Sequence, residues 1–268
     1  MSNTNFILID GSYFIFFRYF AVKQWFRLSH PEEKTETDAL HPDFIDKFKT
    51  TFQEKMLDIS QKLQIENPII LVGKDCPRKK IWRMKFKPTY KENRVYDASF
   101  LGGKFFEMSY KEDMFIKGGA KEILSCDNLE ADDCLALTAK HIQHKYPDAK
   151  IWIITSDMDY LQLANDNVKL FNLKFKDLTD SKNSFKNAEK DLFCKIVTGD
   201  KSDCIPSPFK KCGIKTAEKL YNDRELFKAK LEKEDAYECF ALNKKLIDFN
   251  EIPIDLVENF RTKYNFNY

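Results

Sequence analysis

Three short apolar runs, at residues 6–9, 69–72 and 151–155, are each followed within three residues by an aspartate. Runs of this length with helical patterns between them are typical of buried strands in a parallel α/β sheet. Ligands of such sheets bind beyond the carboxyl ends of the strands. The sequence therefore predicts that three distant carboxylates converge at one edge of a sheet. They are Asp10, Asp75 and Asp157.

The length of 268 residues allows one large core, or a core with a small satellite. With 43% hydrophobic and 32% charged residues, the composition is neither that of a disordered chain nor that of a membrane-spanning one. The apolar segment FILIDGSYFIFF is interrupted by Asp10 and closed by Arg18, without the basic start or cleavage site of a signal peptide. We therefore expect an intracellular protein with no signal peptide and no transmembrane segment.

The seven cysteines form no CxxC pair, and no histidine lies near them at finger-like spacing. This pattern argues against a zinc site or a disulfide framework and predicts a reducing compartment. His141 and His144 would share one face of a helix near its end, but they have no third ligand nearby. A surface position is expected for both.

Two amphipathic helices are predicted between the strands. Phenylalanines recur at three- or four-residue spacing from residue 42 to residue 63, which indicates a helix with a buried aromatic face. A second helix is expected from about Asn128 until Pro147 ends it, with Glu130, Asp132 and Asp133 in or near its first turn.

Two further acidic pairs extend this pattern, because Asp159 follows Asp157 by two residues and Asp200-x-x-Asp203 is expected at a helical turn. One such pair would be explained by helix N-terminal preferences, whereas many acids at one edge need cations to offset their repulsion. Oxygen ligands without His or Cys favour two Mg²⁺ or Mn²⁺ ions, a pair suited to phosphodiester hydrolysis. The predicted metal ligands are Asp10, Asp75, Glu130, Asp132, Asp133, Asp157, Asp159, Asp200 and Asp203.

A basic and aromatic stretch lies between Pro77 and Gly119. Clustered bases with stacking side chains suit single-stranded nucleic acid, although a solvated charged helix would give the same pattern. A phosphate that gains charge during hydrolysis needs positive side chains, and Lys91 and Arg83 are best placed in sequence as catalytic residues. The 44 basic and 42 acidic residues nearly cancel, but acids neutralised by metal would leave a basic surface.

These motifs together resemble the 5′-nuclease superfamily, which includes flap endonucleases, the 5′-exonuclease domain of bacterial DNA polymerase I and phage 5′ exonucleases. LIDGSYFIFFR resembles the opening strand with the first metal aspartate, and KDCPRKKIWRMKFKPTYKENR resembles the second aspartate with its FR…YKxNR block. LEADD, TSDMDYLQL and TGDKSDCIP resemble the three remaining acidic motifs in the family's order. The five motifs extend from Asp10 to about Leu220, with Trp82 in place of a phenylalanine.

The resemblance implies an α/β fold with a PIN-like parallel-sheet nuclease core at residues 1–190, a helical arch at about 91–121, and a C-terminal helical subdomain at 191–268. It implies that Asp10, Asp75, Glu130 and Asp132 serve one ion, and that Asp133, Asp157, Asp159 and Asp203 contribute around the second, with Asp200 in the same acidic pair. Lys91 and Arg83 would contact the phosphate, and Tyr90 and Arg94 would bind DNA.

The family's helix-turn-helix-type element for binding duplex DNA corresponds to KKCGIKTAEKL. Its candidate DNA contacts are Lys210, Lys211, Gly213, Lys215 and Thr216. The usual GIGxKTA pattern has lysine at position 211 here, which puts in doubt the K⁺ ion expected at this hairpin, although the added lysine could itself meet phosphate.

The resulting hypothesis is a monomeric, structure-selective 5′→3′ exonuclease or flap endonuclease that acts on DNA with a single-strand/duplex junction or a free 5′ end, as in replication and repair. A PIN-type ribonuclease, or a nuclease acting on RNA–DNA hybrids, would use much the same acids. The block after Asp75 and the KTAEKL element argue against a plain PIN ribonuclease. A non-catalytic DNA-binding module predicts lost metal ligands, whereas all are present.

Overall fold

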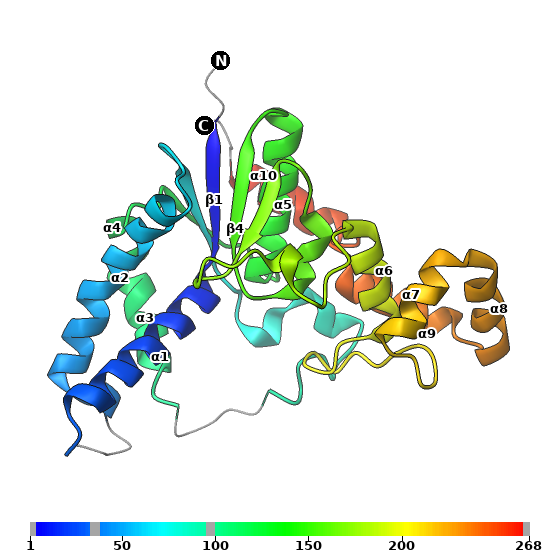
Figure 1. The fold of residues 1–268 in the computed structure, drawn as a ribbon, viewed down its shortest axis with the longest axis horizontal. Coiled ribbons are helices and arrows are strands. Elements are labelled where there is room, and N and C mark those ends of the chain that lie inside the picture. Colours follow the sequence, from blue (N-terminus) through cyan, green and yellow to red (C-terminus); the bar gives the residue numbers. More distant parts are fainter. Residues whose placement is uncertain (1–3, 33–37, 95–99, 265–268) are drawn as a thin grey trace.

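The protein has a five-stranded, fully parallel sheet at its centre, as a computed structural model describes it for residues 4–32, 38–94 and 100–264 (Figure 1). The strands lie in the order β3-β2-β1-β4-β5. In register, Leu8 of β1 lies between Leu71 of β2 and Ile153 of β4. The α/β class predicted from the apolar runs is therefore confirmed. The strands are β1 (Asn5–Asp10), β2 (Ile69–Gly73), β3 (Glu122–Leu124), β4 (Lys150–Ile154) and β5 (Val168–Phe171).

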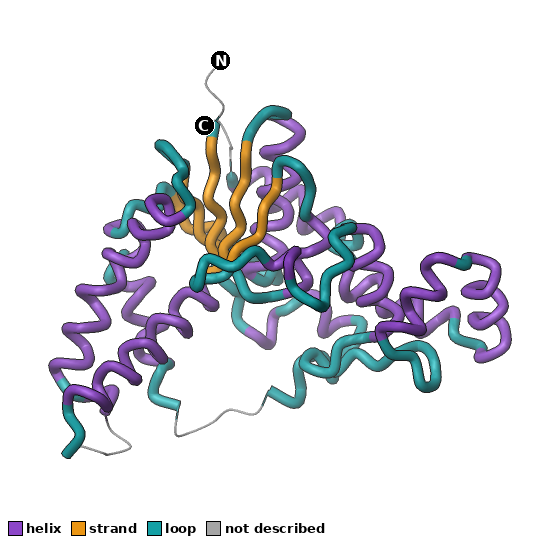
Figure 2. Tube along the Cα trace, in the orientation of Figure 1, coloured by secondary structure: helices purple, strands orange, loops and turns teal. Residues whose placement is uncertain are grey.

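Helices cover both faces of the sheet, because alternate side chains of each strand point to opposite sides. Phe6 and Leu8 pack into one core with α5 (Ala131–Lys145) and α10 (Ile254–Lys263). Ile7 and Ile9 pack into the other with α1 (Gly11–Ser29) and α2 (Pro42–Lys62), so the sheet separates two apolar layers (Figure 2). Within the described residues, none of the helices combines the length and apolarity needed to span a membrane.

The second of these cores is built mainly from aromatic rings. Phe44, Phe48 and Phe52 of α2 are fully buried, as their spacing predicted, and Phe14 of α1 contacts Phe52 edge-on with ring centroids 4.9 Å apart. These buried rings pack α1 against α2.

Much of the stretch predicted to form an arch packs against this core. Residues 95–99 of that stretch lie outside the described residues. Beyond them, α3 (Gly103–Lys111) and the short α4 (Met114–Lys117) bury Phe105 and Phe115 against the rings of α1 and α2. An arch made of the whole of residues 91–121 does not fit this packing, because the apolar faces of α3 and α4 are buried against the body of the protein.

The C-terminal region has a small apolar core of its own, but its last described helix packs elsewhere. Helices α6 to α9 enclose that core, which includes Phe193, Phe209 and Leu231. The chain then returns to the sheet, where Phe260 of α10 is fully buried in the same core as α5. The helical region with this core begins at α6, and the predicted boundary at residue 190 lies within that helix; because α10 belongs to the larger core, residues 191–268 do not form a separate unit. The helices are α6 (Ala188–Thr198), α7 (Ile214–Asn222), α8 (Arg224–Glu234) and α9 (Tyr237–Ile247).

Candidate active site

Three acids lie at the carboxyl ends of neighbouring strands, as the sequence predicted. Asp10 is the last residue of β1, and its Oδ1 accepts a hydrogen bond from Tyr13 N at 3.0 Å, which caps α1. Asp75 follows β2 and accepts from Ala131 N at 2.8 Å, so it is tied to the start of α5. Asp157 follows β4 and begins the 3₁₀ helix at Met158–Leu163. Together with the other predicted metal ligands, these three acids form what we call the acid rim. Its further members are Glu130, Asp132, Asp133, Asp159, Asp200 and Asp203.

Two carboxyl groups of the acid rim, those of Asp10 and Asp159, are buried beside other carboxylates. Burial, together with repulsion from Asp75 and Asp157, raises the pKa of Asp10 from its ordinary 3.8 to about 7. Burial and the charge of Asp157 likewise raise the pKa of Asp159 to about 7, although Lys195 opposes the shift. Carboxylates held in this way resist ionisation unless a cation joins them. The donor set, which contains oxygen and no imidazole or thiolate, fits hard divalent ions such as Mg²⁺ or Mn²⁺.

Glu130, Asp132 and Asp133 form the second part of the rim, at the start of α5. One carboxylate oxygen from each lies within 4.8 Å of the others. Burial, then Asp133 and Glu130, raise the pKa of Asp132 well above its usual range. The prediction that these acids stand at the first turn of a helix is confirmed, because α5 begins at Ala131.

Arg83 is buried beneath this part of the rim, with 2% of its side chain exposed. Its guanidinium donates to both carboxylate oxygens of Asp133, at 2.7 and 2.8 Å, and to Glu130 at 2.9 Å. Its Nε donates to the carbonyl of Leu246 at 2.7 Å. The expectation that Arg83 contacts phosphate does not agree with this geometry, because its donors face inward. Asp133 also accepts from Trp82 Nε1 at 3.0 Å, which leaves its oxygens little room for a metal ion.

Tyr90 and Lys91 connect Glu130 to Asp203, and Arg94 pairs with Asp203. The Tyr90 hydroxyl lies 3.1 Å from both carboxylates, and Lys91 Nζ lies 2.5 Å from Glu130 and 3.6 Å from Asp203. Lys91 is 12% exposed, whereas Arg94 is 53% exposed and contacts Asp203 at 2.7 Å. Burial lowers the pKa of Lys91, but Glu130 and Asp132 raise it more, so it stays charged. Tyr90, predicted as a DNA contact, is instead buried.

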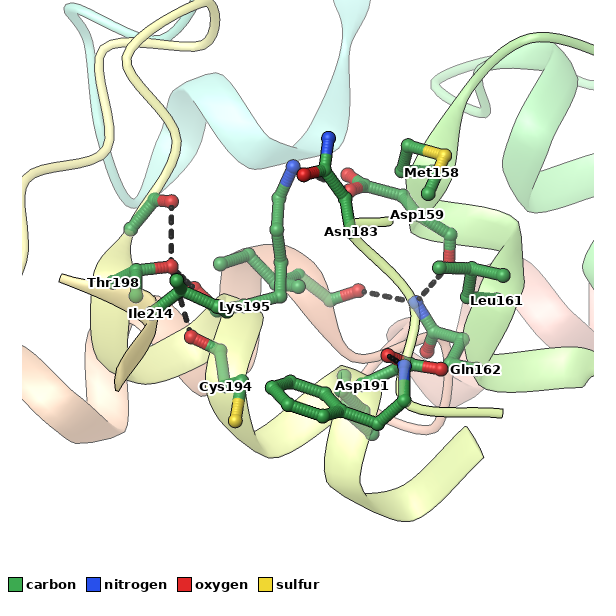
Figure 3. Close-up of a pocket in the computed structure, with 14 residues that line it drawn as sticks. Met158, Asp159, Leu161, Gln162, Asn183, Asp191, Cys194, Lys195, Thr198 and Ile214 are labelled. Atoms are coloured by element: carbon green, nitrogen blue, oxygen red, sulfur yellow. Dashed lines mark hydrogen bonds and ion pairs between the residues drawn. The ribbon is translucent and has the colours of Figure 1, made fainter. Parts of the chain in front are cut away.

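Lys195 was missed by the sequence analysis. Its Nζ lies 2.7 Å from Asp159 and 2.6 Å from Asp200, so one ammonium joins two predicted metal ligands. Figure 3 shows Lys195 and Asp159 together at a cavity of about 290 Å³ between α6 and the 3₁₀ helix. The only available signal was its position five residues before Asp200, on the helix that leads into TGDKSD.

Asp200 and Asp203 lie in a tight turn after α6 rather than in a helix. Gly199 ends α6 with φ of 72°, and a Cβ there would come within 2.4 Å of Ile205 O, so only glycine fits. Burial alone would raise the pKa of Asp200, but hydrogen bonds from Lys195 and Ser202 bring it below its usual range.

The predicted DNA-binding element forms the loop before α7 and the first turn of that helix. Lys210, Lys211 and Lys215 are exposed, and Gly213 precedes the first residue of α7. Lys211 has φ of 53°, a conformation that glycine adopts more easily, so lysine at this family glycine position is tolerated with some strain. Thr216 N bonds to the Gly213 carbonyl at 3.0 Å.

A parallel α/β core that ends in an acid rim, crossed by buried basic side chains, is typical of metal-dependent phosphodiesterases. The family model for the N-terminal resolvase-like domain of 5′–3′ exonucleases matches residues 5–190. The chain belongs to this 5′–3′ exonuclease family, which confirms the resemblance seen in the sequence motifs.

Individual relatives come from two bacteriophages. A ribonuclease H of Enterobacteria phage T4 is 32% identical over 206 residues, which span 69% of this chain and 65% of that protein. The T5 D15 protein co-crystallised with metal ions is 18% identical, with a TM-score of 0.66 over 97% of both chains. A complex of the bacteriophage T5 D15 flap endonuclease with DNA and metal ions gives a TM-score of 0.67 at 18% identity, again over 97% of both chains. At this identity, the T5 structures support the fold alone.

Proposed function

We propose that the chain is a structure-selective 5′→3′ exonuclease and flap endonuclease that hydrolyses DNA phosphodiester bonds as a monomer. The observation that carries this proposal is the position of Lys91, whose charged ammonium stands partly exposed between Glu130 and Asp203. A cation among carboxylates is suited to meet a phosphate that approaches the rim. We take DNA as the substrate by analogy with the T5 flap endonuclease of the same fold, whose structure contains DNA and metal ions.

The rim acids would hold two Mg²⁺ or Mn²⁺ ions in two groups. Asp133 is the exception, because Arg83 and Trp82 occupy its oxygens, and we assign it to positioning Arg83 rather than to direct ligation. When bound, the two ions supply an activated water and stabilise the leaving oxygen. The first group is Asp10, Asp75, Glu130 and Asp132, and the second is Asp157, Asp159, Asp200 and Asp203.

The basic segment around Lys91 would orient the substrate. Lys91 contacts the scissile phosphate, and Arg94, half exposed beside it, contacts a neighbouring phosphate. Tyr90 and Arg83 act as positioning residues, since they hold Glu130 from the buried side and cannot reach a ligand. The duplex would bind the loop before α7 through its exposed lysines and the free amides of the helix N-terminus. We assign no K⁺ ion there.

Hydrolysis of the RNA strand of RNA–DNA hybrids is a second candidate, favoured by the name of the phage T4 relative, ribonuclease H. Both candidate activities use the acid rim. They differ in whether the site recognises DNA or RNA in the strand next to the scissile bond. A plain ribonuclease without duplex binding agrees less well with the exposed lysines before α7.

A cleavage assay on 5′-flap, nicked, single-stranded and RNA–DNA hybrid substrates, each with Mg²⁺ or EDTA, tests the proposal. We expect cleavage of the flap and nicked DNA with Mg²⁺ and none with EDTA. Cleavage confined to the hybrid would favour the second candidate. DNA binding without cleavage under every metal condition would contradict a nuclease.

A further inference from the structure

His30, His41 and Asp43 meet at the end of α1 that is farthest from the sheet. His30 follows α1 directly and His41 precedes α2, so the two ends of one connection lie side by side (Figure 1). One ligand atom from each residue lies within 4.8 Å of the other two. The 19 residues of α1 place this cluster about 28 Å from Asp10, so it is separate from the acid rim.

The hydrogen bonds of Ser29 orient the His30 ring. The Ser29 hydroxyl lies 3.1 Å from the Trp25 carbonyl and 3.2 Å from the Phe26 carbonyl, and both carbonyls can only accept. The Ser29 oxygen also lies 2.9 Å from His30 Nδ1 and accepts from it in the tautomer that carries its proton on Nδ1. In that tautomer, Nε2 carries a lone pair.

That lone pair faces a carboxylate. His30 Nε2 lies 3.2 Å from Asp43 Oδ2, a separation that suits two ligand atoms of one cation, whereas with the proton on Nε2 the same two atoms form a hydrogen bond. Nδ1 of His41 lies 4.0 Å from the same Oδ2 and accepts from Asp43 N at 3.2 Å, so a metal ion would take the lone pair that now caps α2. Three donor atoms therefore converge on one point.

We propose that His30, His41 and Asp43 bind a structural zinc ion. Bonds of about 2.1 Å in a tetrahedral arrangement separate ligand atoms by about 3.4 Å, so the observed 3.2 and 4.0 Å require only a small movement of His41. Two imidazoles with one carboxylate suit Zn²⁺ and disfavour Mg²⁺, and a water completes the four ligands. The acid rim, by contrast, has no imidazole among its proposed metal ligands.

The apolar surroundings hold the two rings in place for this role. The His30 ring stacks on Phe26 with centroids 4.2 Å apart, and the His41 ring packs on the same phenylalanine at 5.2 Å. Phe26 is buried in the aromatic core between α1 and α2. The side chains of His30 and His41 remain 19% and 33% exposed, so an ion can enter from solvent. The ion would fasten the end of α1 to the start of α2.

Cobalt absorption tests this site in the full chain. The chain has four histidines, and a four-coordinate Co²⁺ ion with imidazole ligands absorbs visible light far more strongly than one held by carboxylates and water. The protein is stripped of metal, saturated with Mg²⁺ at the rim, and titrated with Co²⁺ and then Zn²⁺. The variants are His30→Gln, His41→Gln and Asp43→Asn, with His141→Gln/His144→Gln as the matched control.

We expect the band at one equivalent of Co²⁺ in the wild type and in the His141/His144 control, and its displacement by Zn²⁺. The three site variants should lose the band, and tightly bound Zn²⁺ should fall by one ion per chain. Mg²⁺-dependent flap cleavage should persist, which shows that the variants are folded. Absence of the band in the wild type would overturn the proposal, and so would an undiminished band in the site variants.

Discussion

Arg83→Met should destabilise the fold severely, because it leaves a carboxylate buried without its cation. Asp133 is fully buried and takes two of the guanidinium hydrogen bonds, so the substitution strands a charge that, among the described residues, keeps hydrogen bonds only from Trp82 and the Glu130 amide. Removal of one partner of a buried ion pair costs about 3–5 kcal/mol. For a chain of this size, that loss lowers Tm by roughly 6–20 °C.

Urea unfolding of the metal-free protein, followed by circular dichroism, measures this loss. Arg94→Met is the matched control, because Arg94 pairs with Asp203 while 53% exposed and should cost about 1 kcal/mol or less. The double variant Arg83→Met/Asp133→Asn removes the stranded charge and should recover part of the stability. A cost below about 1 kcal/mol for Arg83→Met, or a double variant no more stable than the single one, would refute the role given to this ion pair.

Four further outcomes follow from the rim and the duplex-binding element. Asp10 and Asp159 have pKa values raised from 3.8 to about 7 in the fold, so the folded chain keeps protons that the unfolded chain loses. The contribution of these two groups to the stability of the EDTA-treated protein should therefore be highest below about pH 4, fall as the pH rises towards 7, and level off above pH 7. Urea unfolding midpoints measured across this pH range, with and without Mg²⁺, test this expectation. Bound ions should flatten the pH profile. Lys195→Met should make Mn²⁺ raise Tm more than it does in the wild type, because Asp159 and Asp200 lose their ammonium; equal shifts would count against its bridging role. Asp157→Asn should abolish cleavage but leave duplex binding, measured by anisotropy, nearly unchanged, and parallel loss of both would remove Asp157 from the chemistry. Lys215→Ala should reduce the salt slope of duplex binding by about 0.9, whereas the exposed Lys169→Ala on β5 should leave it unchanged.

The sheet and the positions of most acids could be predicted from sequence because each depends on local pattern. Apolar runs ending in aspartate specify parallel strands, and the shared edge of such strands brings Asp10, Asp75 and Asp157 together whatever lies between them. The start of α5 could also be predicted from the sequence, since acidic residues cluster where a helix begins.

The buried ion pairs could not be predicted in the same way. Arg83 and Tyr90 lie among exposed lysines in the sequence, and only the return of α9 over this segment, with Leu246 O accepting from Arg83, buries them. The types and spacing of residues along the chain do not indicate which distant helix will bury them. The packing of α3 and α4, which belong to the predicted arch, against the aromatic core, and the return of α10 to the sheet, depend on long-range apolar contacts in the same way.

Several rim carboxylates also begin helices. Asp10 accepts from Tyr13 N, Asp157 accepts from Asp159 N, and Asp133 accepts from Glu130 N, so each binds a backbone amide that the helix itself leaves unpaired. An alanine scan of this protein would consequently confuse two losses, since removing the oxygen also frays a helix start by about 1 kcal/mol. Asparagine retains the capping oxygen while deleting the charge, so the difference between the wild type and the asparagine variant isolates what the carboxylate does as an anion, and the difference between the asparagine and alanine variants isolates the cap.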